Sequence, residues 1–378
     1  MQMIRGYKTE LDLNDAQKTL CLKHAGVARY SYNWGLRRYE EEHKAGRKAP
    51  NAISLHKELN ALKQTEFPWM YEVSKCAPQE ALRNLEKAFK SFFGKAKLKA
   101  QGKYRGKVGY PQYKSKKKGI GSFRLTGAIH IFDDRIQLPR IGTVRLHEQG
   151  YLPTTARALS ATVSEKAGRW FVSVQVEVSI PESVEATGSA IGVDLGIKAL
   201  ATVSNGMTIP NPKALRSNLK KLRRACRQHS RKQKGSRNRA KAARKLARLH
   251  AHIANIRKDV LHKATSQIVM RTKSPQTRPS VIVLEDLNVS GMLKNKHLSR
   301  SIADIGFYEF RRQVEYKARQ VGCMVKYVSR WEPSSKTCSS CKTVREELDL
   351  SERLFVCHAC GLVIDRDVNA SYNLADLA

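Results

Sequence analysis

Acidic residues are scarce in this sequence. Its 378 residues include 33 Asp and Glu against 70 Lys and Arg, which gives a formal net charge of +37 and a pI of about 10.1. Residues 87–132 and 195–258 contain no Asp or Glu, and Lys and Arg occupy 12 positions of 87–118 and 18 of 213–258. One short charged run is usually a solvated face, but two long acid-free blocks favour contact with phosphates. We therefore expect a polyanion, first of all nucleic acid, as partner.

Long apolar runs are also absent. No uninterrupted stretch approaches the roughly 20 apolar residues of a membrane-spanning helix, and residues 1–8 contain no apolar signal core. We therefore expect a cytoplasmic protein with no membrane partner. The hydrophobic fraction of 41% at a mean hydropathy of −0.49 is enough for folded cores, and the length suggests two to three domains.

The hydrophobic periodicity predicts a mixed chain. In the N-terminal part we expect a strand at 2–9, helices at 14–42, 54–64 and 78–94 with Gly94 as the stop signal, and short strands at 122–126, 129–131, 135–138, 144–146, 156–163 and 170–178. After a linker at 181–188 we expect strands at 190–195, 199–204, 280–284 and 324–328, a basic helical hairpin at 214–271 that breaks at Gly235, and a helix at 302–321 whose start is capped by Ser301 and Asp304. Tyrosines at 104, 110 and 113 lie between basic residues, where they could stack on bases or anchor a loop.

Acidic residues at three places stand out in this basic chain. Asp194 lies in an apolar strand, Glu285 ends another, and Asp365 and Asp367 lie at the start of a C-terminal helix. Each alone could cap a turn or form an ion pair. Together they are typical of a two-metal phosphodiesterase, in which carboxylates hold Mg²⁺ ions that stabilise the attacking and leaving oxygens. The sequence does not show that these segments meet in space.

The cysteines give the most specific spacing. Four are scattered, whereas Cys338, Cys341, Cys357 and Cys360 form two C-x-x-C pairs. Four thiolates at this spacing predict a closed tetrahedral Zn²⁺ site with a structural role, in preference to a redox pair. Because four sulfurs fill the zinc shell, His358 is expected to be a surface residue.

These motifs resemble the TnpB family of transposon-encoded RNA-guided DNA nucleases, which are similar to compact type V CRISPR effectors. The resemblance covers essentially the whole chain, and the sequence elements that carry it are Gly192–Lys198, Val283–Leu287, Pro333–Cys341, Cys357–Gly361 and Asp365–Ala370, together with Ala28–Trp34, the helix that contains Phe92 and Phe93, and Tyr110–Lys114. Lys342 departs from the family pattern, which commonly has Gly after the second cysteine.

The resemblance implies a multidomain α+β fold with an RNase H-like RuvC nuclease domain. Its expected parts are a wedge β-barrel at 1–10 and 119–185, a helical recognition domain at 11–118, the RuvC domain at 186–335 and 363–378 with a basic helical insertion at 213–271, and a zinc ribbon at 336–362. It also implies Asp194, Glu285 and Asp367 as catalytic Mg²⁺ ligands. Asp367 is preferred to Asp365 because the family's catalytic acid stands two positions before the Asn, here Asn369.

The same resemblance implies the partners and the reaction. We expect a bacterial or archaeal protein that binds, as a monomer, a guide RNA from the transposon end and makes double-strand breaks in DNA. Candidate residues for recognising a short target-adjacent motif are Lys75, Gln79 and Thr126. Three alternatives stay open: a nuclease-inactive RNA-guided repressor, a strand-joining transposase, and a non-enzymatic zinc-ribbon RNA-binding protein.

Overall fold

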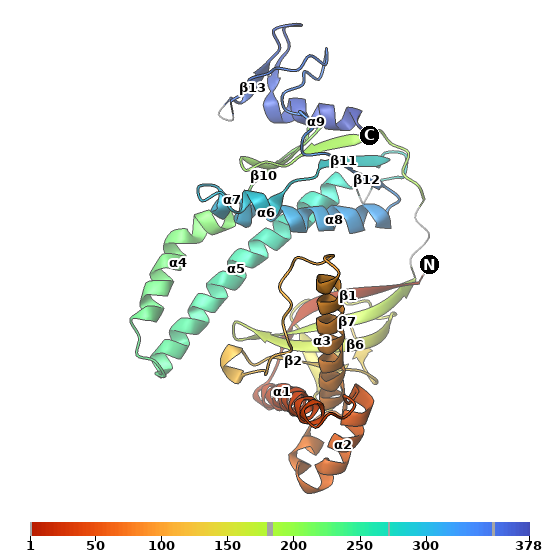
Figure 1. Cartoon of the computed structure of the whole chain (residues 1–378), viewed down its shortest axis with the longest axis vertical. Coiled ribbons are helices and arrows are strands. Elements are labelled where there is room, and N and C mark those ends of the chain that lie inside the picture. Colours follow the sequence, from red (N-terminus) through yellow and green to blue (C-terminus); the bar gives the residue numbers. More distant parts are fainter. Residues whose placement is uncertain (1, 180–183, 271–272, 350–351) are drawn as a thin grey trace. The chain divides into compact units, whose positions relative to one another are not determined.

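The computed structural model describes residues 2–179, 184–270, 273–349 and 352–378 (Figure 1). The chain divides into two compact units, residues 1–180 and 181–378. Both mix helices with sheets, so the chain has a multidomain α+β fold. The described helices include none long and apolar enough to cross a bilayer. Of the predicted linker at 181–188, residues 181–183 lie outside the described residues.

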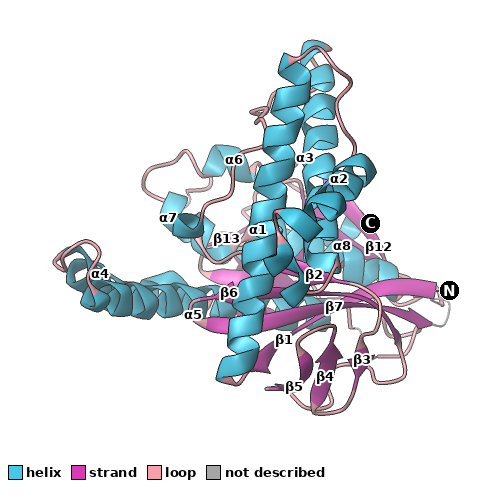
Figure 2. Ribbon diagram, turned by 90° about the horizontal axis from the view of Figure 1, so that it is seen from below, coloured by secondary structure: helices cyan, strands magenta, loops and turns pink. Residues whose placement is uncertain are grey.

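The first unit is built on a seven-stranded antiparallel sheet. Its strand order is β2-β6-β7-β1-β5-β4-β3, with β1 Gln2–Asp12, β2 Ser122–Leu125, β3 His130–Ile131, β4 Arg135–Leu138, β5 Gly142–Leu146, β6 Arg157–Lys166 and β7 Arg169–Ser179. These strands confirm the predicted ones. The register of β1 and β7 runs from Gln2 opposite Ser179 to Leu11 opposite Trp170, and β1 pairs with β5 at Leu11 and Asp12. Figure 2 shows this sheet beside helices α1 and α3.

Three helices separate β1 from β2. They are α1 Asp15–Lys44, α2 Ala52–Thr65 and α3 Cys76–Ala100, with the short 3-10 helix η1 Pro68–Glu72 before α3. Asn14 caps α1 as predicted, and Leu82 and Leu85 of α3 are buried against α1. The predicted stop at Gly94 is wrong, because α3 continues to Ala100. One exposed glycine costs a helix only about 1 kcal/mol, and the flanking Lys, Ala and Leu residues are good helix formers.

The second unit contains a five-stranded mixed sheet. Its order is β10-β9-β8-β11-β12, with β8 Ile191–Asp194, β9 Ala199–Val203, β10 Thr208–Pro210, β11 Val281–Glu285 and β12 Met324–Val328. Strand β11 is parallel to both β8 and β12, and Leu284 lies opposite Val193. The carboxyl ends of β8 and β11 therefore meet at one edge of the sheet.

Helices cover both faces of this sheet (Figure 1). Ile282 and Leu284 face the core formed with α5 Arg237–Ile268 and α8 Phe307–Gln320, whereas Val283 faces α9 Arg366–Asp376. Gly192 allows α9 to approach closely, since a Cβ there would lie 2.1 Å from the Ser371 carbonyl oxygen. The remaining elements are α4 Ala214–Ser230, α6 Val289–Met292, α7 Ser299–Ile305, β13 Leu354–Val356 and β14 Val363–Asp365.

The helix predicted at 302–321 is two helices. Gly306, with φ of +81°, separates α7 from α8. Asp304 does not cap this helix: its carboxylate accepts hydrogen bonds from the Leu215 amide at 2.9 Å and from Arg257 Nε at 2.7 Å. It therefore anchors the base of the α4–α5 hairpin, whose predicted turn at Gly235 is confirmed.

Candidate active site and metal centre

The structure places the three predicted acids in one cleft. Asp194 ends β8, Glu285 ends β11, and Asp367 is the second residue of α9, which packs on β8. All three line a cleft of about 830 Å³ within the second unit. The parallel pairing of β8 with β11 brings the first two together, and the packing of α9 on Gly192 adds the third.

The pKa of Asp194 reflects its burial and the proximity of the three acids in the cleft. Burial, followed by the nearby charges of Glu285 and Asp367, raises the pKa of Asp194 to about 7, and Arg366 opposes this rise. Repulsion between carboxylates disfavours their joint ionisation unless cations are present. Oxygen donors of this kind suit Mg²⁺, so the residues fit the predicted metal.

Asp365 and Asp367 have different surroundings. Asp365 Oδ1 accepts hydrogen bonds from the backbone amides of Asp367 at 2.9 Å and Val368 at 3.2 Å, which makes Asp365 the N-cap of α9. Asp367 projects from the first turn and lines the cleft. The cap accounts for an Asp at position 365.

Glu285 has a partner that the sequence did not predict. Ser334 Oγ donates a hydrogen bond of 2.5 Å to Glu285 Oε1, and Ser334 is 3% exposed. The loop that carries Ser334 is tied to α9, because Asn373 Nδ2 donates to the Ser334 carbonyl at 2.8 Å and to the Thr337 carbonyl at 2.6 Å. A buried hydroxyl of this kind fixes the orientation of the Glu285 carboxylate.

Asn369 links the same loop to the cysteine region. Its Nδ2 donates to the Thr337 carbonyl at 2.6 Å, and its Oδ1 accepts from the Ser339 amide at 2.9 Å. Asn369 is fully buried. The sequence signal for this role is an Asn pair at i and i+4, Asn369 and Asn373, on the apolar face of a short helix.

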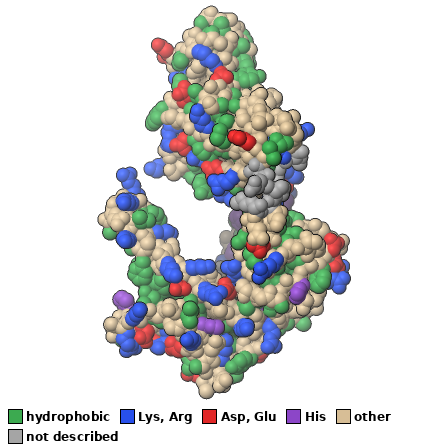
Figure 3. Space-filling view, turned by 90° about the vertical axis from the view of Figure 1, so that its right-hand side faces the viewer, with side chains coloured by type: hydrophobic (Ala, Val, Ile, Leu, Met, Phe, Trp, Pro, Cys, Tyr) green, Lys and Arg blue, Asp and Glu red, His purple; other side chains and the backbone are tan. Residues whose placement is uncertain are grey.

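The cleft also contains cations that the sequence analysis did not single out. Six basic residues line it: Lys198, Lys213, Arg216, Lys336, Arg353 and Arg366. Mixed acidic and basic lining suits a phosphodiester, because carboxylates can hold cations while guanidinium and ammonium groups contact phosphate oxygens. Lys and Arg side chains are also spread over both units on the face that Figure 3 shows.

The four predicted zinc ligands lie together. The sulfur atoms of Cys338, Cys341, Cys357 and Cys360 lie within 4.8 Å of one another, and among the described residues no other group of His, Cys, Asp or Glu gathers so tightly. Two of the Sγ–Sγ distances are 3.5 and 3.6 Å. Tetrahedral Zn–S bonds of about 2.3 Å require sulfur separations of about 3.8 Å, so the cluster fits zinc and not disulfides.

The two cysteine knuckles have matching turns. Lys342 and Gly361 follow the second cysteine of their pairs, and both have positive φ, +62° and +74°. The departure from Gly at 342 therefore places a non-glycine residue in a left-handed conformation, while the Lys342 ammonium pairs with Asp376 of α9. His358 is exposed, as expected for a residue outside the metal shell.

The candidate motif-recognition residues lie near one another in the first unit. Lys75 is the exposed N-cap of α3, and Gln79 lies half-buried one turn later. Cys76 Sγ lies 3.3 Å from Thr126 Oγ1, at the end of β2. The start of α3 therefore lies next to the end of β2.

Three family profiles match parts of this chain. The family profile OrfB_IS605, described as "Probable transposase", matches residues 161–296, and "Cas12f1-like, TNB domain" matches residues 307–374. A third profile, "Helix-turn-helix domain", matches residues 1–48, where the structure has strand β1 and the single helix α1.

Relatives match over nearly the full length. "Putative RNA-guided DNA endonuclease" of Streptomyces pristinaespiralis is 37% identical over 377 residues, with 99% of this chain and 89% of the relative covered. "Putative RNA-guided DNA endonuclease InsQ" of Escherichia coli (strain K12) is 32% identical over 395 residues, with 99% and 92% covered. The fold is similar to a solved Cas12f1-sgRNA-target DNA complex, with 14% identity, a TM-score of 0.55, and 95% of this chain and 82% of that chain covered.

Proposed function

Because the chain belongs to the TnpB family of RNA-guided DNA endonucleases, we propose that it cuts double-stranded DNA at sites selected by a bound guide RNA. The observation that carries this proposal is the convergence of Asp194, Glu285 and Asp367 in one cleft with a raised Asp194 pKa. A protein that only binds nucleic acid has no need for three mutually repelling carboxylates at one sheet edge.

The proposed reaction is hydrolysis of a phosphodiester. Asp194, Glu285 and Asp367 would hold Mg²⁺, which supplies an activated water and stabilises the leaving oxygen. Ser334 keeps Glu285 in position, and cations such as Arg366 and Lys336 at the cleft contact the strand's phosphates. The four-cysteine ribbon, with zinc, is structural, since four sulfurs leave no open coordination position.

We further propose how the partners are divided over the chain. The α4–α5 hairpin is rich in exposed Lys and Arg and is suited to the backbone of a guide RNA from the transposon end, with one protein chain per RNA. Lys75, Gln79 and Thr126 would contact the target-adjacent DNA motif. Base pairing then selects the target, as in the general logic of guided nucleases.

The proposed domain division keeps the expected boundaries. The five-stranded sheet with helices on both faces supports a RuvC-type nuclease domain at 186–335 and 363–378. The small sheet of β13 and β14 and the cysteine cluster support a ribbon at 336–362. The seven-stranded sheet and the helices α1 to α3 support the wedge and recognition parts of the first unit.

A plasmid-cleavage assay tests the proposal. The full chain is purified with its RNA, the RNA is sequenced, and a plasmid that carries the matching target is incubated with and without Mg²⁺. We expect linear product only with Mg²⁺, and Asp194→Ala should abolish it while leaving RNA binding unchanged. Target binding without cleavage by the wild type would favour the repressor, RNA binding without target recognition would favour the non-enzymatic alternative, and joined strands would favour a transposase.

A further inference from the structure

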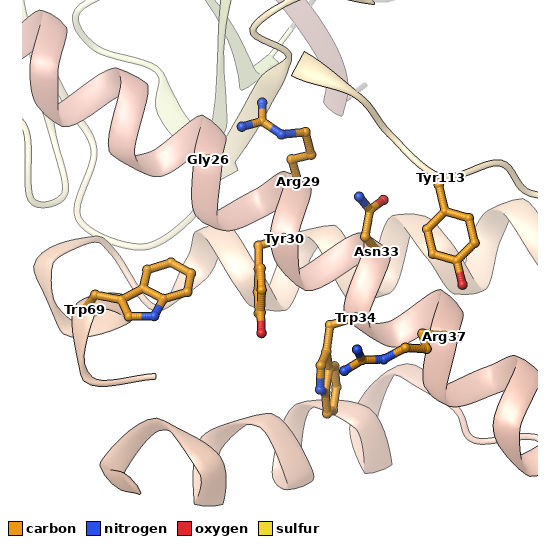
Figure 4. Close-up of a pocket in the computed structure, with 8 residues that line it drawn as sticks. All are labelled: Gly26, Arg29, Tyr30, Asn33, Trp34, Arg37, Trp69 and Tyr113. Atoms are coloured by element: carbon orange, nitrogen blue, oxygen red, sulfur yellow. The ribbon is translucent and has the colours of Figure 1, made fainter. Parts of the chain in front are cut away.

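The first unit contains a pocket that no proposed step above uses. It has a volume of about 430 Å³, within the range of about 300–1,000 Å³ typical of ligand sites. Figure 4 shows its lining, which comes from α1, η1 and the loop before β2: Gly26, Arg29, Tyr30, Asn33, Trp34, Arg37, Trp69 and Tyr113. Four of these eight residues are aromatic, two are arginines and none is acidic.

The aromatic walls are held in place by the protein's own contacts. Tyr30 packs edge-on against Trp69, with ring centroids 5.2 Å apart. Tyr113 donates a hydrogen bond to Glu40 at 2.8 Å, and Asn33 exchanges two hydrogen bonds, of 2.9 and 2.8 Å, with the backbone of Lys114. Trp69 is nevertheless 40% exposed and Tyr113 48% exposed, so both offer aromatic surface to a ligand.

Gly26 leaves the floor of the pocket open. Glycine is unfavourable in the middle of a helix such as α1. No neighbour requires it here, since a Cβ at Gly26 would meet no atom within 4 Å. A side chain at this position would instead extend into the pocket that Gly26 lines.

The two arginines supply positive charge beside the aromatic rings. Arg29 donates to the Ile120 carbonyl at 3.1 Å through Nη1, and Arg37 makes an exposed ion pair with Glu41 at 3.6 Å. A guanidinium group has five donors, so each retains donors for a further acceptor. Aromatic surface for a base and guanidinium groups for a phosphate are the two contacts by which proteins bind unpaired nucleotides.

We propose that this pocket binds one unstacked nucleotide, with its base against Tyr30, Trp69 or Tyr113 and a phosphate at Arg29 or Arg37. The inference rests on the proposed function and assigns to the nucleic acid a defined binding site in the first unit. The nucleotide can belong to the guide RNA or to the DNA, because the shared chemistry is a base next to a phosphate.

Ultraviolet crosslinking at 254 nm tests this inference. Two samples of the full chain are irradiated, one with its co-purified RNA alone and one after addition of target DNA, and crosslinked peptides are mapped by mass spectrometry. We expect crosslinks at Tyr30, Trp69 or Tyr113 to RNA in the first sample, or to DNA in the second only, which identifies the source. Absence of crosslinks at all three residues in both samples would overturn the proposal.

Matched variants distinguish a loss of nucleotide binding in the pocket from a general destabilisation of the helices. Gly26→Leu should lower the crosslink yield at least fivefold, whereas Gly94→Leu, at an equally open glycine of α3 outside the pocket, should leave it unchanged. Trp69→Ala should act like Gly26→Leu, and Trp69→Phe should restore crosslinking at Tyr30 or Tyr113; thermal unfolding checks that each variant folds. An unchanged yield in Gly26→Leu contradicts the proposal.

The same preparations are assayed for DNA cleavage. Cleavage without crosslinks overturns the proposal that the pocket binds a nucleotide, but not the proposed function. Crosslinks without cleavage overturn the proposed function but not the pocket.

Discussion

The cysteine cluster and the carboxylate cleft of the second unit are assembled in different ways. The cysteine ligands all lie between Cys338 and Cys360, and their sulfurs lie within 4.8 Å of one another. The carboxylates Asp194, Glu285 and Asp367 come from three segments far apart in sequence. Burial, followed by the charges of Glu285 and Asp367, raises the pKa of Asp194. The zinc ribbon is therefore a local structure, whereas the cleft depends on the packing of a whole unit.

The two centres are nevertheless connected. Asn369 lies in α9, two positions after Asp367. Its side chain hydrogen-bonds to the Thr337 carbonyl, in the loop before Cys338, and to the Ser339 amide. From that loop Ser334 reaches Glu285. A change in the ribbon can therefore reach two of the three carboxylates through α9 and this loop.

Loss of a cleft carboxylate should have the largest effect. Asp367→Asn removes one negative charge from the proposed Mg²⁺ site, and we expect the single-turnover cleavage rate to fall by at least ~10³-fold. RNA binding should stay within about twofold, because the proposed RNA contacts are made by the Lys and Arg side chains of the α4–α5 hairpin. Single-turnover cleavage and filter binding measure the two quantities.

Asp365→Ser is the matched control. Serine caps helices about as well as aspartate, so α9 should keep its N-terminus. Cleavage within about threefold of the wild type is expected. A loss as large as that of Asp367→Asn would show that the two acids have been assigned the wrong way round.

Uncoupling the ribbon from the cleft should have an intermediate effect. Asn369→Ala removes the amide that joins α9 to Thr337 and Ser339, so we expect cleavage to fall roughly 10–100-fold, as for other residues that orient metal ligands. Zinc content, measured by atomic absorption, should stay at one ion per chain. This combination would show that the connection itself, and not the loss of zinc, impairs the cleft.

Tyr372→Ala, on the exposed side of α9, controls for a general weakening of this helix. Its cleavage rate should be close to that of the wild type. Unchanged cleavage in Asn369→Ala would mean that the ribbon and the cleft act independently, in contradiction to the connection described above.

The contrast between the centres also explains what could be predicted from sequence. The two C-x-x-C pairs predict the cysteine cluster, because all four cysteines lie in one segment between Cys338 and Cys360. Asp194 and Glu285 could be recognised as acids at the ends of apolar strands, but their convergence needs the parallel pairing of β8 with β11. Ser334 carries no sequence signal for its bond to Glu285, since serine is common in loops.

The roles of several glycines and tyrosines also depend on tertiary contacts. Gly94 was predicted to end a helix and does not, whereas Gly306 interrupts a predicted helix with a φ of +81°. Tyr110 packs against Phe89 and Phe92, so it anchors its loop, while Tyr113 of the same loop lines the pocket on α1. Local sequence cannot distinguish these cases, because tertiary contacts decide which conformation or face is used.

The smallest expected effect is the pH dependence of Mg²⁺ binding at the carboxylate cleft. Because the pKa of Asp194 is raised from 3.8 to about 7, the metal-free folded protein binds more protons than the unfolded chain between about pH 4 and 7. Ionisation of Asp194 therefore lowers the stability of the metal-free protein as the pH rises through that range. Mg²⁺ must displace the proton, so the apparent Mg²⁺ affinity should be about tenfold lower at pH 6 than at pH 8. Thermal unfolding during Mg²⁺ titrations at both pH values measures this difference. Asp194→Asn should remove the pH dependence; a dependence that persists in this variant would assign the titration to another group.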